Sequence, residues 1–146
     1  MASKLNPRAR RRSRRALVQA VYQWQLADTD TAVVEREFLE AQALQKADVE
    51  FFKELLRGVL PHSAEIDELF VAYLDRELSS LDQVELAILR LGAFELKHRV
   101  DVPYRVVIDE YVELAKLFGA QDSYKYVNGV LDRLAREVRQ IERHGS

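Results

Sequence analysis

The sequence predicts an all-α protein of about seven helices. Apolar residues recur at intervals of three and four along successive segments, which is the spacing of one face of an amphipathic helix. No segment alternates apolar and polar residues with the period of two that a half-buried strand shows. The pair Asn128-Gly129 lies inside a strong helical pattern and does not join two strand-like runs, so it does not predict a hairpin.

The first two helices are expected on either side of the sequence ADTDT at residues 27–31. Asn6-Pro7 is a favourable start for the first, because asparagine caps an opening turn and proline at the first position leaves no donor unpaired. Asp30 or Thr31 can cap the second. The apolar positions are Leu17, Ala20, Val21, Trp24 and Leu26 in the first helix and Val34, Phe38 and Leu39 in the second.

The third and fourth helices are expected to meet at Pro61, which should kink or end the third. Asp48 can cap the start of the third helix. The apolar positions are Phe51, Phe52, Leu55, Leu56, Val59 and Leu60 in the third helix and Ile66, Leu69, Phe70, Tyr73 and Leu74 in the fourth.

Turn-forming sequences separate the last three helices. Ser80 or Asp82 starts the fifth, and VDVPY at residues 100–104 separates it from the sixth, which ends at Gly119. Asp122 or Ser123 caps the seventh. The positions on the inner face are Val84, Ile88, Leu91, Phe94 or Glu95, and Leu96, then Tyr104, Ile108, Tyr111, Ala115 and Phe118, and finally Val127, Val130, Leu131, Leu134, Val138 and Ile141.

Length and composition predict a single domain over residues 1–146, with residues 1–9 as a flexible arm and 141–146 as a frayed tail. The absence of cysteine excludes a disulfide framework and a thiolate metal site. No apolar run approaches the roughly 20 residues of a membrane span, so we expect a cytoplasmic protein with no membrane partner.

The charge is sorted along the chain. Residues 1–27 hold seven basic and no acidic residues, and six of the eight residues 8–15 are arginine. Like charges four residues apart destabilise a helix, and cations at its N-terminal end oppose the helix dipole. A polyanion would remove both penalties, because phosphates accept paired hydrogen bonds from guanidinium groups and favour a helix N-terminus. We therefore predict a nucleic-acid-binding arm that is loose when free and becomes ordered on the ligand.

Three other interpretations of this segment stay open. Arginine is a good helix former, so the run could be a solvated helix end in a purely structural module. An arginine-rich, acid-free segment also resembles a mitochondrial presequence. The short FGAQD turn at residues 118–122 could belong to a helix-turn-helix that binds duplex DNA, although Asp109, Glu110 and Glu113 would then meet the phosphates.

The stretch AQDSYKYVNGV at residues 120–130 is a second candidate for nucleic-acid contact. Ser123, Lys125 and Asn128 can hydrogen-bond phosphates or base edges, and Tyr124 or Tyr126 can stack on an unpaired base. Either tyrosine could instead belong to the core.

No catalytic, metal or cofactor site is predicted. Glu95 and His98 have the Glu-x-x-His spacing of helical metal sites, but the further ligands are missing, and we expect both on a solvated surface. Asp109 and Glu113 are four residues apart, and we expect them to form a solvated acidic face of a helix. The chain also lacks a phosphate-binding glycine loop, so we predict that it is not an enzyme and needs no cofactor.

Two long segments resemble the NusB family of bacterial transcription antitermination factors: RRRSRRALVQAVYQWQL and DVPYRVVIDEYVELAKLFGAQDSYKYVNGVLDRLA. QVELAILRLGAFEL between them fits the same family, and the resemblance runs from about Arg10 to Ala135. It implies two small helical bundles and a non-catalytic factor that binds the single-stranded boxA element of nascent RNA, notably in ribosomal RNA operons. The implied partners are the small-subunit ribosomal protein that doubles as NusE and the RNA polymerase antitermination complex.

The resemblance also implies which residues make these contacts. The residues at the RNA are Arg10, Arg11, Arg12 and Arg14, with Arg15 and Lys4 as lesser contacts, and Asp122, Lys125, Tyr126 and Asn128. Asp122 could instead cap the last helix. The face for the ribosomal protein includes Tyr22, Leu26 and Glu85, although Tyr22 and Leu26 could be core residues.

Two further expectations come from the family. Some members self-associate over the RNA-binding face, so a homodimer stays open. NusB-like domains also begin certain ribosomal RNA methyltransferases, and because no cofactor-binding domain follows in this sequence, we expect the antitermination factor.

Overall fold

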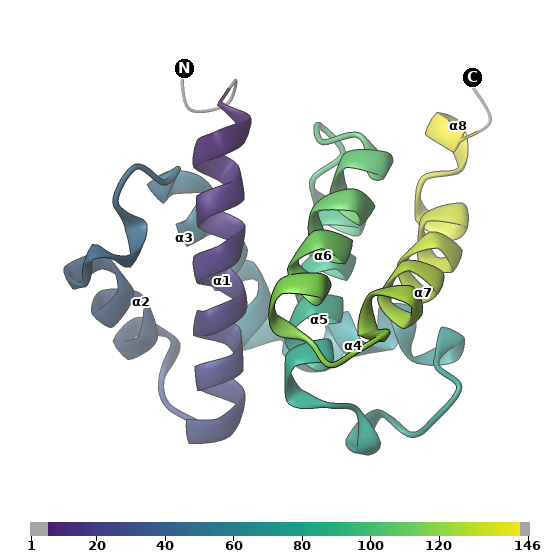
Figure 1. Cartoon of the computed structure of the whole chain (residues 1–146), viewed down its shortest axis with the longest axis horizontal. Coiled ribbons are helices and arrows are strands. Elements are labelled where there is room, and N and C mark those ends of the chain that lie inside the picture. The colour runs from purple at the N-terminus through teal and green to yellow at the C-terminus, as the bar shows by residue number, and fades with distance from the viewer. Residues whose placement is uncertain (1–5, 144–146) are drawn as a thin grey trace. The chain divides into compact units, whose positions relative to one another are not determined.

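The structure, a computed structural model, describes residues 6–143, and within that range its regular elements are all helical (Figure 1). Seven α-helices of eight or more residues are present in this part of the chain, together with the short α8 and several 3₁₀ turns. The chain divides into two compact units, residues 1–61 and 62–146. The all-α class, the approximate number of helices and the two small bundles are thus confirmed. The interpretation of residues 1–146 as a single domain stays a prediction.

The first unit contains α1 (Pro7–Ala27), α2 (Thr31–Glu40), the 3₁₀ turn η2 (Gln42–Leu44) and α3 (Val49–Val59). Helix α1 packs against α2 and α3. The core contains most residues of the expected apolar faces, and the rings of Phe38 and Phe52 stack with their centroids 5.9 Å apart. Helix α3 ends directly before the 3₁₀ turn η3 (Leu60–His62), which contains Pro61. Leu26 and Leu39, expected at apolar core positions, are exposed.

Helix α1 begins at the predicted residue. Asn6 Oδ1 accepts a hydrogen bond from the Ala9 amide at 3.0 Å, which caps the first turn. Ala9 is buried, and its carbonyl accepts a hydrogen bond from the Asp48 amide at 3.1 Å. The prediction of a flexible arm over residues 1–9, loose until it binds nucleic acid, is therefore wrong for residues 7–9. Residues 1–5, including Lys4, lie outside the described residues.

A buried serine fixes α1 against the start of α3. Ser13 Oγ donates to the Asp48 carbonyl at 2.6 Å and accepts from the Asp48 amide at 2.9 Å. The Asp48 carboxylate in turn accepts from the Phe51 amide at 3.1 Å, which confirms the predicted cap of α3. These bonds determine which side of α1 faces the core. The presequence interpretation does not fit this packing, because residues 7–27 contribute a core helix of the first unit.

The second unit is built mainly from three long helices. These are α5 (Gln83–His98), α6 (Tyr104–Phe118) and α7 (Ser123–Val138), and each packs against the other two. The unit also holds α4 (Ser63–Phe70), the 3₁₀ turns η4 (Val71–Tyr73) and η5 (Leu78–Ser80), and α8 (Gln140–Arg143). A Cβ atom at Gly92 of α5 would lie 2.8 Å from Leu131 Cδ1 of α7, so glycine allows these two helices to approach closely.

The helix ends of the second unit follow the predictions in part. The Asp82 carboxylate accepts from the amides of Val84 at 2.7 Å and Glu85 at 3.2 Å, which caps α5 as expected. Asp122 occupies the N-cap position of α7 with a left-handed backbone, φ 68°, but its side chain makes no capping bond, so it does not cap as expected.

The C-terminal tail is helical in its described part. Ile141, expected on the apolar face of the seventh helix, is exposed and belongs to α8. Glu142 Oε2 accepts from the Tyr104 amide at 2.9 Å and so satisfies a donor in the first turn of α6. The frayed tail predicted from residue 141 is therefore wrong for residues 141–143, and residues 144–146 lie outside the described part.

Glu95 was expected on a solvated surface, and the structure places it in the interior. Its side chain is fully buried, and Oε2 accepts a hydrogen bond of 2.5 Å from the Tyr111 hydroxyl. The expected solvated Glu95 is thus wrong, because a buried hydroxyl donor on α6 satisfies the carboxylate inside the unit. His98, one turn later, is exposed as expected.

Candidate nucleic-acid interface

The arginines of α1 fall into two sets on opposite sides of the helix. Arg8, Arg11, Arg12 and Arg15 are exposed and line a hollow of about 320 Å³, and we call this set the arginine stripe. Spacings of three and four residues place them on one helix face. No ion pair of Arg8, Arg12 or Arg15 is found among residues 6–143, so no acidic neighbour within that range offsets the repulsion between Arg8 and Arg12.

Arg10 and Arg14 point into the first unit. Their Cζ atoms lie 4.5 Å and 4.9 Å from the centroid of the Phe51 ring, which is the geometry of a cation–π contact. Arg10 Nε is also 3.5 Å from Asp48 Oδ2, and Arg14 is only 3% exposed. The prediction that these two arginines contact RNA directly is not supported by this placement, because both guanidinium groups pack on a core aromatic ring.

A signal for this division is present in the sequence. Arg10 and Arg14 continue the stripe of the buried Leu17 and Val21 at spacings of three and four residues. Arg8, which lies on the opposite stripe, is a member of the exposed set that the sequence analysis missed. The position of an arginine on the helix, and not its charge alone, decides whether it reaches solvent.

Tyr22 and Leu26 lie on the exposed side of α1, with 38% and 59% of their surface accessible. Both continue the stripe of Arg8, Arg12 and Arg15 through the exposed Gln19 toward the C-terminal end of the helix. The alternative that both are core residues is therefore wrong. One face of α1 carries cationic residues in its first half and an aromatic–aliphatic pair in its second half.

Glu85, expected beside them on the partner face, is placed differently. It is 8% exposed, and its Oε2 accepts a hydrogen bond of 2.7 Å from the hydroxyl of Ser123 at the start of α7. A carboxylate held in this way joins α5 to α7 inside the second unit. The structure therefore gives Glu85 an internal role and does not present it on an exposed face.

The first turns of α7 present polar side chains. Asp122, Lys125 and Asn128 are exposed, and Lys125 Nζ lies 3.6 Å from Asp122 Oδ1. Tyr124 is half-buried, and its ring centroid lies 5.0 Å from Lys116 Nζ and 6.0 Å from Lys125 Nζ. Lysine and asparagine side chains in these turns can donate to phosphate or base acceptors, and their contact with RNA stays a prediction.

Tyr126 is also half-buried, and its partner is a residue that no local sequence pattern predicts. The guanidinium Cζ of Arg76 lies 4.3 Å from the centroid of the Tyr126 ring, and the Asp75 amide donates to the tyrosine hydroxyl at 3.3 Å. Burial raises the pKa of Tyr126 above its usual range, which keeps the phenol neutral. Fifty residues separate the two side chains, so only the fold brings them together.

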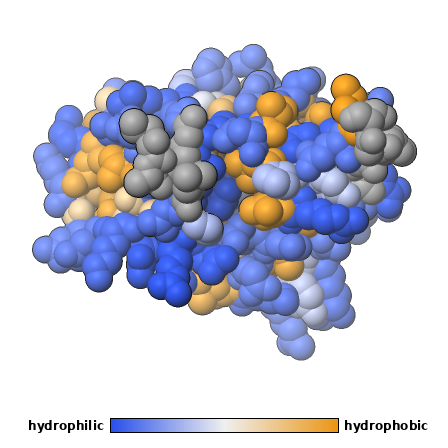
Figure 2. Space-filling model, turned by 90° about the horizontal axis from the view of Figure 1, so that it is seen from above, coloured by the Kyte–Doolittle hydropathy of each residue, from blue (hydrophilic) through white to orange (hydrophobic). Residues whose placement is uncertain are grey.

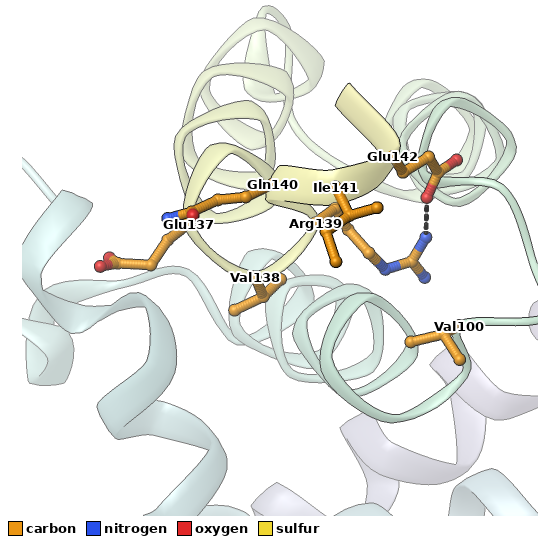
Figure 3. Close-up of a pocket in the computed structure, with 7 residues that line it drawn as sticks. All are labelled: Val100, Glu137, Val138, Arg139, Gln140, Ile141 and Glu142. Atoms are coloured by element: carbon orange, nitrogen blue, oxygen red, sulfur yellow. Dashed lines mark hydrogen bonds and ion pairs between the residues drawn. The ribbon is translucent and has the colours of Figure 1, made fainter. Parts of the chain in front are cut away.

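The second unit has a pocket of about 620 Å³ at its C-terminal end (Figure 3). It is lined by Val100, Glu137, Val138, Arg139, Gln140, Ile141 and Glu142. Figure 3 shows Arg139 facing Glu142, to which Nη1 donates at 2.6 Å, whereas the Glu137 side chain points away from this pair. The charged groups facing each other in this pocket hold helix ends together.

The surface seen from the end where α8 lies is mostly hydrophilic, with hydrophobic residues in separate patches (Figure 2). No group of three or more histidine and acidic side chains placed to hold a metal ion occurs within residues 6–143. None of the described helices has the length and hydropathy of a membrane span.

The fold places this chain in the class of small all-helical proteins built from two helical units. The NusB family model matches residues 11–136, and the chain belongs to the NusB family. These are transcription antitermination factors, regulatory proteins and not enzymes, as the sequence predicted.

Proteins similar to the chain cover nearly all of it. The transcription antitermination protein NusB of Alcanivorax borkumensis is 59% identical over 136 residues, which are 93% of this chain and 91% of the relative. The corresponding protein of Proteus mirabilis is 54% identical over 93% of this chain and 99% of its own length.

Two solved structures are also similar. T. maritima NusB has a TM-score of 0.78 at 34% identity and covers 92% of this chain and 96% of its own. A NusB chain solved with NusE and double-stranded RNA has a TM-score of 0.81 at 27% identity, covering 90% of this chain and 98% of its own.

Proposed function

We propose that this protein binds the boxA element of nascent transcripts, notably those of ribosomal RNA operons, together with NusE in the RNA polymerase antitermination complex. The observation that carries the proposal is the arginine stripe, an exposed cationic surface at the N-terminal end of α1. A similar NusB was solved in complex with NusE and double-stranded RNA, which supports the same two classes of partner here. Such a role belongs in the cytoplasm.

We propose that different residues contact the phosphates and the bases of the RNA. The arginine stripe binds phosphates, because guanidinium groups donate paired hydrogen bonds to phosphate oxygens and the helix N-terminus favours an anion. Lys125 and Asn128 contact phosphates and unpaired bases at the start of α7, where Asp122 positions Lys125, and Tyr126 contributes to this surface through its contact with Arg76. Arg10 and Arg14 act indirectly, since they fix α1 on Phe51 and so orient the stripe.

The rival interpretation, a helix-turn-helix that binds duplex DNA, has less support. The residues before the α6–α7 turn include the exposed Asp109 and Glu113, which would repel phosphates at the position of the supporting helix. A purely structural module leaves the repulsion between Arg8 and Arg12 without a ligand that offsets it. Family membership also favours the antitermination factor over both rivals.

Equilibrium binding of the full chain tests the proposal. The probes are a single-stranded boxA RNA, a scrambled strand of equal composition and a DNA duplex, each titrated across a range of salt concentrations with and without NusE. We expect tighter binding to boxA than to the scrambled strand, and a further gain when NusE is present. Equal affinity for all three probes, or preference for the duplex, would contradict the proposal. A dimer that dissociates when RNA is added would indicate that self-association covers the same face.

We further propose that Tyr22 and Leu26 form the partner face. Tyr22→Asp is expected to weaken binding to NusE by about 30-fold or more, because central aromatic residues dominate interface energetics and a buried carboxylate would be left unpaired. Binding to bare RNA should stay within about twofold, since the phosphate contacts proposed for α1 are confined to the other half of the helix. Pull-down with NusE and anisotropy with RNA measure the two effects.

Leu39→Asp on α2 is the matched control, because Leu39 lies in the same unit and is as exposed as Tyr22. This variant should retain NusE. If Tyr22→Asp also retains it, the partner face lies elsewhere.

A further inference from the structure

Asp75, Arg76 and Tyr126 form a small cluster in the second unit, which we call the Arg76 stack. Asp75 and Arg76 lie between η4 and η5, and Tyr126 lies in the first turns of α7. The guanidinium Cζ is 4.3 Å from the ring centroid, within the range of a cation–π contact. The backbone amide of Asp75 donates to the tyrosine hydroxyl at 3.3 Å, so the segment between η4 and η5 contacts α7 at two points.

Asp75 holds the guanidinium in a defined plane. Arg76 Nε and Nη2 donate to Asp75 Oδ1 and Oδ2 at 2.7 Å and 3.4 Å. The same contacts hold the pKa of the Asp75 carboxyl below its usual range, with the Arg76 hydrogen bond as the main cause and the Tyr126 hydroxyl as a further one. The guanidinium is thus oriented before any ligand arrives, which lowers the entropic penalty of using it as a binding surface.

The Arg76 side chain nevertheless remains 43% exposed. The guanidinium Cζ lies over the Tyr126 ring, and Nε and Nη2 are paired with Asp75, so a ligand approaching from solvent meets the exposed remainder of a flat, weakly hydrated cation. Arginine planes of this kind stack on unpaired nucleic-acid bases. Lys125 and Asn128 lie one and two residues from Tyr126 in the same helix and are exposed, so donors for a nucleotide backbone are close by in sequence.

We propose that Arg76 is a base-stacking residue of this protein: an unpaired base of the bound RNA lies on the guanidinium of Arg76, which Tyr126 and Asp75 hold in place. This inference rests on the proposed RNA-binding function and adds a residue and a contact type to it. A phosphate is the less suitable ligand at this position, because the Asp75 carboxylate already neutralises the cation and would repel a second anion. Tyr126 acts here as a positioning residue beneath the guanidinium.

Two substitutions separate stacking from charge. Arg76→Ala removes both the plane and the charge, and Arg76→Lys keeps the charge and removes the plane. If the base stacks, both variants should bind the boxA strand about tenfold more weakly than the parent, and the slope of log affinity against log salt should stay unchanged. A phosphate contact would instead make the lysine variant bind nearly as well as the parent, and the alanine variant would lose about 0.7 from the slope.

An abasic scan of the RNA identifies the partner base. Each base of the boxA strand is removed in turn, and binding is measured with the parent and with Arg76→Ala. At one position we expect base removal to weaken binding to the parent and to leave binding to the variant unchanged, because the stack is already lost. Tyr126→Leu should reproduce this pattern, and the Arg76→Ala, Tyr126→Leu double variant should be no weaker than either single variant.

Arg57 provides the matched control. Its guanidinium is exposed and forked on Glu35, with Nε and Nη2 donating at 2.8 Å and 2.7 Å, so Arg57→Ala and Arg57→Lys remove the same kind of ion pair in the first unit. Both should bind RNA like the parent. The stacking role is overturned if Arg76→Ala binds RNA like the parent. It is also overturned if Arg76→Lys binds like the parent while Arg76→Ala has a shallower slope of log affinity against log salt. In both cases the proposed function stands. If the parent does not prefer boxA RNA to the scrambled strand, the proposed function fails and the stacking role fails with it.

Discussion

Replacing Arg8, Arg11, Arg12 and Arg15 by glutamine is expected to weaken binding to boxA RNA about 100-fold near physiological salt. Each phosphate contact with a single strand contributes about 0.7 to the slope of log affinity against log salt, so losing four contacts should make the slope shallower by about 3. The four side chains are exposed and line one hollow, so their removal leaves the core of the first unit intact. Anisotropy titrations across a salt range measure both quantities.

A charge-matched variant distinguishes a site from a general effect of net charge. Arg36, Lys97, Arg105 and Arg133 are exposed basic residues outside the proposed surfaces, and replacing all four by glutamine changes the net charge equally. This control should lose little affinity, because screening limits the effect of distant surface charges to about 10 Å at moderate salt. If the control weakens binding as much as the stripe variant, the stripe is not the site. Circular dichroism should show parental helicity for both variants.

Arg139→Met is expected to lower the free energy of unfolding by about 3 kcal/mol. The Arg139 guanidinium is buried and donates to three backbone carbonyls at the C-terminal end of α5, those of Leu96 at 2.7 Å, Arg99 at 3.0 Å and Glu95 at 3.2 Å. It also pairs with Glu142 (Figure 3), whose other oxygen accepts from the Tyr104 amide of α6. Methionine fills a similar volume and leaves these acceptors without their donor.

Urea unfolding followed by far-ultraviolet circular dichroism measures this effect. Arg136→Met is the matched control, because Arg136 lies three residues earlier on α7 and makes an exposed ion pair with Asp132 at 3.1 Å. Exposed pairs of this kind contribute at most about 1 kcal/mol. An unchanged unfolding midpoint for Arg139→Met would show that solvent or neighbouring groups satisfy the carbonyls and that Arg139 is not a structural clamp.

The sequence predicted the helices well because their signals are local. Amphipathic spacing identified the seven main helices, and the side chains of Asn6, Asp48 and Asp82 cap the helices that they were expected to cap. Asp122 was less predictable, since a residue at a helix start can turn its side chain toward a neighbour, here Lys125, without capping. Residue type therefore predicts which residue stands at the N-cap position more readily than whether its side chain makes the capping hydrogen bond.

The candidate site was predictable in composition and not in detail. The arginine run and the polar residues of α7 were identified from residue type, but the inward placement of Arg10 and Arg14 depends on the Ser13–Asp48 contact and on the ring of Phe51. Glu85 was assigned to an exposed face by the family resemblance, and Glu95 was assigned to a solvated surface because the further ligands of a metal site were missing. Their partners, Ser123 and Tyr111, lie on other helices.

The sequence by itself determined the helical class, the helix starts, the family and the concentration of positive charge at one end. These properties follow from the order of neighbouring residues, which sets periodicity, capping and local charge. Only the tertiary structure decided which arginines face solvent, which carboxylates are internal and that Arg76 lies on Tyr126. The reason is physical: the burial of a charged side chain depends on a partner brought from a distant segment, and no local pattern specifies that partner.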